Sequence, residues 1–248
     1  TSTASVNVTV ALNDADPYIV TTGAPAPLTA LHSGQRVGTK GDDIISPFTL
    51  PFPIPFYGNL TSSIRISTNG ALYIPIPPDF ATPTPNFAQI DFAVATEPNL
   101  EGLAMIAGMW CDIRTDRNST DGIWMVQPDI DTVIFRWQAV TFSTETPVNF
   151  EIELRRDGSI RTRYGNGNSN LNPVIVGISG GDPDAYLVPT HSSTSGPLSL
   201  TNASSVTFAL RNPPPPPIAD LSVRVTSDPH PVFPGQNITY LVSVSNLG

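Results

Sequence analysis

The chain contains 248 residues, of which 13% are charged, 27 are proline and only one is cysteine, and its formal net charge is −9. This acidic balance excludes a basic surface for nucleic acid or anionic membranes, and a single cysteine cannot form a disulfide framework. No apolar run reaches the roughly 18 residues of a membrane span, so we expect no membrane insertion. The length suffices for one large β domain or two smaller ones.

In chain order, the first predicted element is a strand near the N-terminus. "ASVNVTVAL" alternates Val6, Val8 and Val10 with other residues, which is the period of two typical of a β-strand. The "NDADP" that follows marks a junction between domains. We therefore assign residues 1–20 to a separate strand-bearing segment.

Residues 21–211 are predicted to form one β domain. Gly and Pro interrupt the sequence so often that no segment sustains the apolar period of a helix. "SSIRISTNGALYIPI" indicates a hairpin around Asn69-Gly70, and "GLAMIAGMW" is typical of a strand buried on both faces. "GIWMVQ" and "DTVIFRWQAV" flank the turn signal "PDID".

One hairpin, "VNFEIELRRDGSIRTRYG", can be read in register. A two-residue loop at Asp157-Gly158 would mix apolar and charged residues on each face. A three-residue loop, with Arg156 included and Gly158 in the left-handed conformation, keeps the faces separate. The resulting pairs are Leu154 with Ile160, Phe150 with Tyr164, Glu153 with Arg161, and Glu151 with Arg163. We expect one core face and one charged, solvated face.

Oxygen-bearing side chains gather in the loop "CDIRTDRNSTDG". Calcium takes six to eight oxygen ligands, so this loop is a candidate calcium site, with a solvated hairpin loop as the alternative. The candidate ligands are Asp112, Asp116, Asn118 and Asp121. We expect no other cofactor.

Catalytic signals are weak. "GISGG" places Ser179 in the pattern of a nucleophile elbow, but that elbow requires a following helix, and "DPDAYLVP" is a poor helix. We therefore expect no enzymatic activity and no catalytic residues, and we interpret Cys111 as a buried small apolar residue. Five aromatic residues either line a glycan-binding platform or belong to the core: Phe48, Phe52, Phe56, Tyr57 and Tyr73.

A domain boundary is predicted at residues 212–217, because Pro213 to Pro217 favour an extended polyproline spacer. Residues 218–248 are too few to build a core alone. They include "ITYLVSVSNLG", in which Ile238, Tyr240, Val242 and Val244 alternate with other residues as in a strand. We expect this strand to lack a partner within its own segment.

Two resemblances extend this interpretation. The stretch from Ala219 to Gly248, with "ADLSV", "PV", "GQNITY" and "NLG", resembles the first half of an Ig-like repeat of the domain-of-unknown-function-eleven family of surface proteins. "TSTASVNVTVALNDADP" resembles the second half of the same repeat. The resemblance implies a small β-sandwich module split between residues 218–248 and 1–20.

The middle domain resembles the nidogen-type extracellular domain over residues 42–187. The similarity lies in the order of "FTLPFPIPFYGNLTSSIRISTNGALYI", "IAGMWCDIR", "VIFRWQAV", "NFEIELRRDGSIRTRYG" and "VIVGISGGD". It implies a secreted, extracellular or cell-surface β-sandwich used in adhesion and matrix assembly, with no catalytic residues.

The predicted fold is therefore all-β: a large β-sandwich-like domain plus a split Ig-like module. The leading hypothesis is a subunit or repeat of an extracellular filament, in which copies pair head to tail by β-strand complementation. The interface would contain Val6, Val8, Val10, Ile238, Tyr240, Val242 and Val244. Closure within one chain, a covalently continuous repeat and a sequence cut inside a module stay open. The alternatives in function are an adhesin that binds glycans or matrix, and an accessory domain of a secreted hydrolase.

Overall fold

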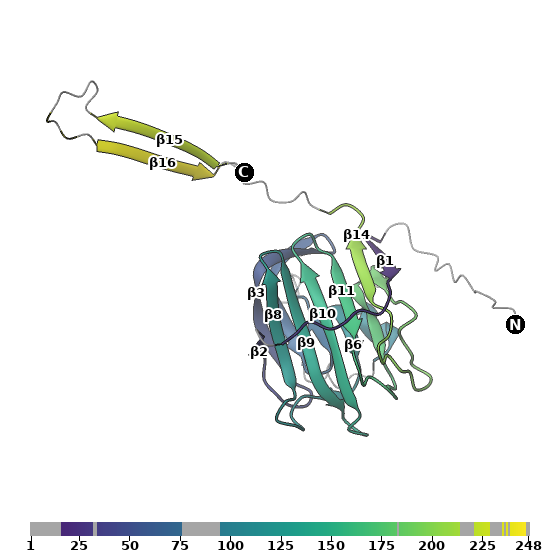
Figure 1. Cartoon of the computed structure of the whole chain (residues 1–248). Helices are drawn as coiled ribbons and strands as arrows, with labels where there is room; N and C mark the ends of the chain where they lie inside the picture. Colours follow the sequence, from purple (N-terminus) through teal and green to yellow (C-terminus); the bar gives the residue numbers. More distant parts are fainter. Residues whose placement is uncertain are drawn as a thin grey trace, which may run out of the picture. The chain divides into compact units, whose positions relative to one another are not determined.

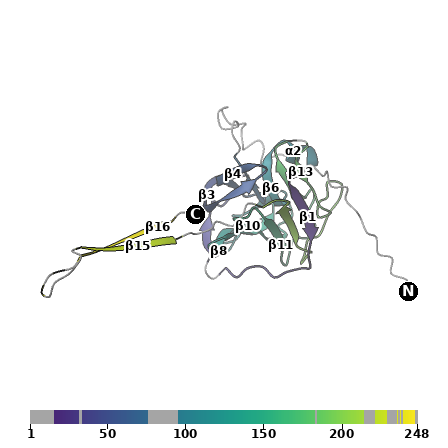
Figure 2. The ribbon, with the colours of Figure 1, turned by 90° about the horizontal axis from the view of Figure 1, so that it is seen from above.

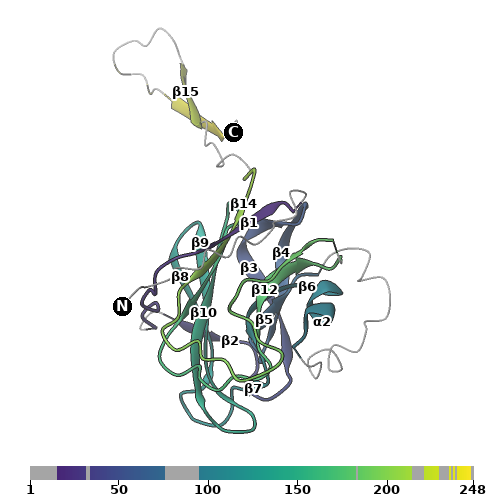
Figure 3. The same ribbon diagram turned by 90° about the vertical axis from the view of Figure 1, so that its right-hand side faces the viewer.

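A computed structural model describes residues 16–31, 34–75, 95–182, 184–213, 221–228 and 239–246, together with Gly235 and Asn237. The chain divides into two compact units, Thr1–Pro213 and Pro214–Gly248. We name them the body and the C-terminal unit. The described part of the body consists of two antiparallel sheets, which Figures 1 and 3 show from two sides.

The larger sheet of the body, sheet A, has eight strands. Its spatial order is β1 (Tyr18–Thr22), β14 (Val206–Leu210), β11 (Ile160–Tyr164), β10 (Pro147–Arg155), β9 (Thr132–Thr141), β8 (Gly122–Asp129) and β2 (Gln35–Val37), and β7 (Ile113–Arg114) also pairs with β9. The expected turn at "PDID" is confirmed, because β8 and β9 pair on either side of it.

The second sheet, sheet B, has six strands in the order β13 (Tyr186–Leu187), β12 (Ile175–Gly180), β6 (Ala104–Trp110), β5 (Ala71–Tyr73), β4 (Asn59–Ser67) and β3 (Ile45–Phe56). The "GLAMIAGMW" prediction is confirmed: β6 is central, and all its residues after the first are buried. The hairpin at Asn69-Gly70 is also confirmed, because it joins β4 to β5. The expectation of no helix is wrong for one short helix, α2 (Glu97–Glu101), whose N-cap Thr96 accepts a hydrogen bond from the Asn99 amide.

The core lies between the two sheets and contains aromatic side chains that also bond across it. Trp137 of sheet A stacks on Phe150 at 5.0 Å between ring centroids, and its indole N–H donates to the Ser67 carbonyl of sheet B at 3.0 Å. The Tyr164 hydroxyl similarly donates to the Gly108 carbonyl at 3.0 Å. Buried polar groups need such partners, so these bonds also fix how the sheets stack.

The predicted register of the β10–β11 hairpin is confirmed at all four pairs. Its Gly158 adopts a φ of 86°, as a three-residue loop with a left-handed glycine requires. The expectation of a solvated charged face is wrong, however, because Glu151 is 0% exposed and Glu153 is 5% exposed.

A segment that we name the strap, residues 23–31, covers this charged face. It follows β1 and crosses the outside of sheet A in an extended form, which is the dark trace in front of β11, β10 and β9 in Figure 1 and the lower edge of the body in Figure 2. Thr29 of the strap donates its amide and hydroxyl to the Glu151 carboxylate at 3.0 and 3.1 Å. Arg136 of β9 donates to the Thr29 carbonyl at 2.6 Å. The strap therefore buries the row of charged side chains on this face, which would otherwise lie at the surface of sheet A.

The buried row is a compact ion network. Arg163 lies 2.6 Å from Glu151 and 2.9 Å from Glu153, and it also donates to the Pro27 carbonyl of the strap at 3.4 Å. Burial raises the pKa of Glu151, although Arg163 and the Thr29 bonds act in the opposite direction.

The free edge of sheet B is formed by β3, and its outward positions carry proline. Pro47, Pro51 and Pro53 are exposed, whereas the alternate residues Leu50, Phe52 and Ile54 enter the core. Proline has no N–H to offer a further strand, so this edge resists pairing with another sheet.

Replacing Pro51 and Pro53 together by threonine is expected to raise self-association of the chain, because the two substitutions restore edge donors without changing the core face. Light scattering during gentle heating measures the effect. A matched change of Thr61 and Ser63 on the paired strand β4 to valine adds no donor at the edge, and it should not reproduce the association. Equal aggregation of both variants would contradict the role of the prolines.

Candidate functional site

The C-terminal unit contains one described hairpin, β15 (Leu221–Asp228) paired with β16 (Thr239–Asn246). The register sets Val223 opposite Val244 and Val225 opposite Val242. Directly opposed residues of an antiparallel pair lie on the same face, so all four valines share a face. Tyr240 belongs to the same alternation. We name Val223, Val225, Tyr240, Val242 and Val244 the valine face.

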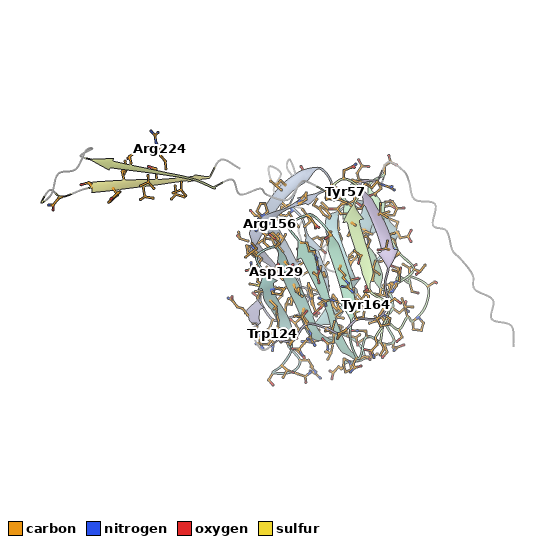
Figure 4. All side chains as sticks on the ribbon, turned by 45° about the horizontal axis from the view of Figure 1, so that its top comes forward. Tyr57, Trp124, Asp129, Arg156, Tyr164 and Arg224 are labelled. Carbon is orange, nitrogen blue, oxygen red and sulfur yellow. The ribbon has the colours of Figure 1, made fainter. Side chains whose placement is uncertain are left out.

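The valine face is exposed. Its five side chains keep between 57% and 63% of their surface accessible, and no described residue covers them. The opposite face carries Arg224, which projects from β15 in Figure 4, together with Thr226, Ser243 and the exposed Leu241. An isolated two-stranded hairpin is marginally stable in water, and this contiguous exposed apolar face makes the hairpin the candidate site of the chain.

Part of the predicted interface is thereby corrected. The strand that ends in "SVSN" does have a partner in its own segment, because β15 pairs with it over eight residues. Among the described residues, no further segment packs over the apolar face of this hairpin. Val6, Val8, Val10 and Ile238 lie outside the described residues, so their contribution stays a prediction.

The chain enters and leaves the body at neighbouring positions. Tyr18 at the start of β1 lies opposite Leu210 at the end of β14. Arg211 donates its amide to the Pro17 carbonyl and its Nε to the Asp16 carbonyl, both at 2.8 Å. The described hydrogen bonds of the body therefore already include Asp16 and Pro17.

A buried carboxylate holds this entry point. Asp16 is 2% exposed, and its side chain accepts a hydrogen bond from the Tyr18 amide at 2.8 Å and one from the Tyr57 hydroxyl at 3.4 Å. Burial raises the pKa of Asp16. The sequence singled out Asp16 only by its place in "NDADP" and did not predict its burial.

The predicted calcium ligands do not converge. Asp116 forms an ion pair with Arg114 at 2.8 Å, and the Asp121 carboxylate accepts bonds from the amide and side chain of Asn118 at 2.7 and 3.1 Å. Burial raises the pKa of Asp112, and the negative charge of Asp43 raises it further. Among the described residues, no group of three or more His, Cys, Asp or Glu side chains is placed to hold a metal ion.

Asp112 interacts through its charge with two other carboxylates, Asp42 and Asp43. Partial burial and then the charges of Asp43 and Asp112 raise the pKa of Asp42 to about 6. The positive charge of Arg114 opposes this rise in the pKa of Asp42.

The nucleophile candidate, Ser179, bonds backbone groups. Ser179 is fully buried, donates to the Glu101 carbonyl at 3.3 Å and accepts from the Gly181 amide at 3.0 Å. His191 instead bonds the Ser204 carbonyl and stacks on Tyr164. Cys111 is 5% exposed, and burial raises the pKa of its thiol, as expected of a structural cysteine.

The five aromatic residues considered for a glycan platform belong to the core. Phe52 and Phe56 are at most 3% exposed in the main core, and Phe48 and Tyr57 pack partly buried against it. Tyr73 is 3% exposed and lies in the second buried apolar cluster. They do not form an exposed platform.

Two antiparallel sheets packed on a shared main core, with a second, smaller apolar cluster that includes Tyr73 and Trp110, define an all-β sandwich domain. A family model described as NIDO related matches residues 18–214, so the chain belongs to the NIDO-related family, the relatives of the nidogen domain. The match confirms the nidogen resemblance and extends it beyond residues 42–187. The family suggests an extracellular context. The Ig-like resemblance of residues 219–248 and 1–20 stays a prediction.

No curated protein and no solved structure matches the chain. Within the described ranges, no helix combines the length and the apolar character needed to cross a membrane.

Proposed function

We propose that the chain is a structural subunit or repeat of an extracellular or cell-surface filament. Copies associate head to tail when a strand from residues 5–12 of one copy covers the valine face of the next. The observation that carries this proposal is the exposed valine face. The NIDO-related family and its extracellular context support it.

The energetics favour a covered face. Burying a valine side chain stabilises by about 1.5 kcal/mol or more, so four valines and Tyr240 supply several kcal/mol to a joint between copies. Ordering a free segment offsets part of this gain. Main-chain bonds to an open hairpin edge add to the joint without demanding a particular sequence.

Residues 5–12 fit the role by pattern. Val6, Val8 and Val10 recur every second residue, so a strand here presents three valines to one side. The contact joins different surfaces on the two copies, and such a heterologous contact repeats into a filament.

Replacing Val242 by lysine is expected to abolish assembly, because it removes a buried valine and places a charge within the joint. Weakening by at least tenfold corresponds to the lost burial alone. Sedimentation velocity from 1 µM to 1 mM and electron microscopy measure the assemblies. Ser243→Lys lies on the opposite face of the same strand and is the matched control, with assembly retained.

Deletion of residues 1–12 provides the reciprocal test. The variant should remain a folded monomer at every concentration, because the described body starts at residue 16. Filaments formed by the deletion variant, or equal effects of Val242→Lys and Ser243→Lys, would overturn the proposal.

A further inference from the structure

The strand β1 forms one edge of sheet A, beside β14 (Figure 1). Among the described strands, only β14 pairs with it. Odd-numbered residues make the bonds at both ends of this pairing: Pro17 accepts the Arg211 amide, and Gly23 donates its amide to the Ser205 carbonyl. Successive residues of a strand direct their backbone groups to alternate sides. The odd-numbered residues of β1 therefore bond β14, and the even-numbered residues point their backbone groups away from it.

These outward backbone groups belong to Tyr18, Val20 and Thr22. The Tyr18 amide already has a partner, because it donates to the Asp16 carboxylate at 2.8 Å. No described residue bonds the amides of Val20 and Thr22 or the outward carbonyl groups beside them. A row of such groups at a sheet edge is a template for a further strand.

The other edges of the two sheets are less suited to accept a strand. The edge strand β3 of sheet B carries prolines, β13 has two residues, and β2 at the far edge of sheet A has three. β1 has five residues, "YIVTT", with neither proline nor charge. Because the whole chain has a net charge of −9, an uncharged edge is a place where two copies can approach without repulsion between like charges.

We propose that two copies of the chain pair through their β1 edges, antiparallel about a two-fold axis at Val20, so that their two A sheets continue as one. The edge is complementary to itself. Each Val20 exchanges both backbone bonds with Val20 of the second copy, and each Thr22 amide donates to the Tyr18 carbonyl of the other copy. These four bonds use every amide that the edge leaves open, since Asp16 already satisfies the Tyr18 amide.

The side chains fit the same register. Val20 is partly buried and packs against the core, so pairing sets two valines side by side at the margin of both cores. On the outer face, Ile19 of one copy lies opposite Thr21 of the other. Cross-strand pairs of β-branched residues stabilise antiparallel strands, and no charged residue enters the contact.

The contact is small, because β1 brings only five residues from each copy, whereas a stable interface brings about 20–30 residues from each side. Separate copies therefore pair only transiently. Copies aligned in a filament multiply the contact, so it would join filaments side by side. The β1 edge goes beyond the head-to-tail joint of the proposed function, and the pairing itself does not depend on that joint.

Disulfide trapping captures a transient contact of defined register. Ile19→Cys and Thr21→Cys are made in separate full-length chains, each with Val242→Lys to remove the proposed head-to-tail joint. Opposed residues of a non-hydrogen-bonded pair have Cα atoms about 4.5 Å apart, which suits a disulfide. Mixed dimers, identified by peptide mass spectrometry, should form severalfold faster than the dimer of either chain alone. Cys111 is buried, and the chain without an added cysteine measures its background.

Variants at the edge test whether the backbone groups are responsible. Val20→Pro, added to both cysteine chains, removes the central outward amide and should abolish the preference for mixed dimers. Val20→Thr keeps the amide and the β-branched shape, so it is the matched control and should retain the preference. Thr22→Pro removes the second outward amide at the last residue of β1 and provides the same test if Val20→Pro does not fold.

The outcomes separate this pairing from the filament joint. Mixed dimers that form no faster than the dimers of each chain, or a preference that survives both proline variants, would overturn the β1 pairing and leave the head-to-tail joint standing. A preference for mixed dimers that depends on the Val20 amide, together with no filaments of the unsubstituted chain, would support the pairing and overturn the proposed function.

Discussion

Replacing Gly70 by alanine is expected to destabilise the body by about 4 kcal/mol. Gly70 turns the chain between β4 and β5 with a φ of 83°, a conformation that costs an L-residue about 1–2 kcal/mol. A Cβ atom there would also lie 2.3 Å from the Met109 carbonyl oxygen and 3.1 Å from the Phe150 ring. The backbone of the central strand β6 would have to shift, and overpacking of this kind costs about 1–3 kcal/mol more.

Gly58 is the matched control. It has a similar φ of 79°, but an added Cβ would meet no heavy atom within 4 Å. Gly58→Ala should therefore cost only the conformational part, about 1–2 kcal/mol. Urea unfolding, followed by tryptophan fluorescence, gives both free energies. Equal losses in the two variants would contradict the close approach between the turn and β6.

Replacing Glu151 by alanine is expected to cost about 3–5 kcal/mol. The substitution leaves Arg163, whose side chain is only 13% exposed, with one carboxylate instead of two. It also removes both hydrogen bonds that hold Thr29 of the strap. Breaking a buried ion pair by removing one partner has a cost of this size. Glu151→Gln retains an acceptor for Thr29 and loses no volume, so it should cost less than alanine.

Asp131→Ala is the control for this prediction. Asp131 pairs with Arg156 at the surface, where its side chain is 57% exposed, and exposed pairs contribute at most about 1 kcal/mol. Thermal and urea unfolding measure all three variants. Equal losses at Asp131 and Glu151 would mean that the strap does not bury the row.

The Glu151 contribution also depends on pH. Because burial raises its pKa in the folded protein, its contribution to stability is fully present below the ordinary value of about 4.3 and declines as pH rises through the folded value. The advantage of the natural chain over Glu151→Ala should therefore be larger at pH 4 than at pH 7. A larger advantage at pH 7 would contradict the direction of the shift.

Local patterns predicted the paired elements well. The register from Phe150–Tyr164 to Leu154–Ile160 follows from alternation and one left-handed glycine, both properties of adjacent residues. The burial of Glu151 was not predictable in the same way, because its cover comes from Thr29, 122 residues earlier in the chain. Nothing in the alternation of "NFEIEL" distinguishes a solvated face from one covered by a strap.

The candidate interface was likewise predictable in its local alternation but not in its longer-range pairing. Alternation in "ITYLVSVSN" predicted the strand and its apolar residues, and the valines of β16 are indeed on one face. The pairing with β15 was not predicted, because the alternation within a strand does not identify the strand that pairs with it. Sequence proximity also suggested the four candidate calcium ligands, but the structure pairs Asp116 with Arg114 and Asp121 with Asn118.

The neighbouring positions of Asp16 and Arg211 have a mechanical consequence. Tension applied through the two flanks pulls β1 and β14 apart from one end, so their hydrogen bonds break one after another instead of sharing the load. Peeling therefore begins at the Arg211 bonds, continues along β1 and then loads the strap at Thr29.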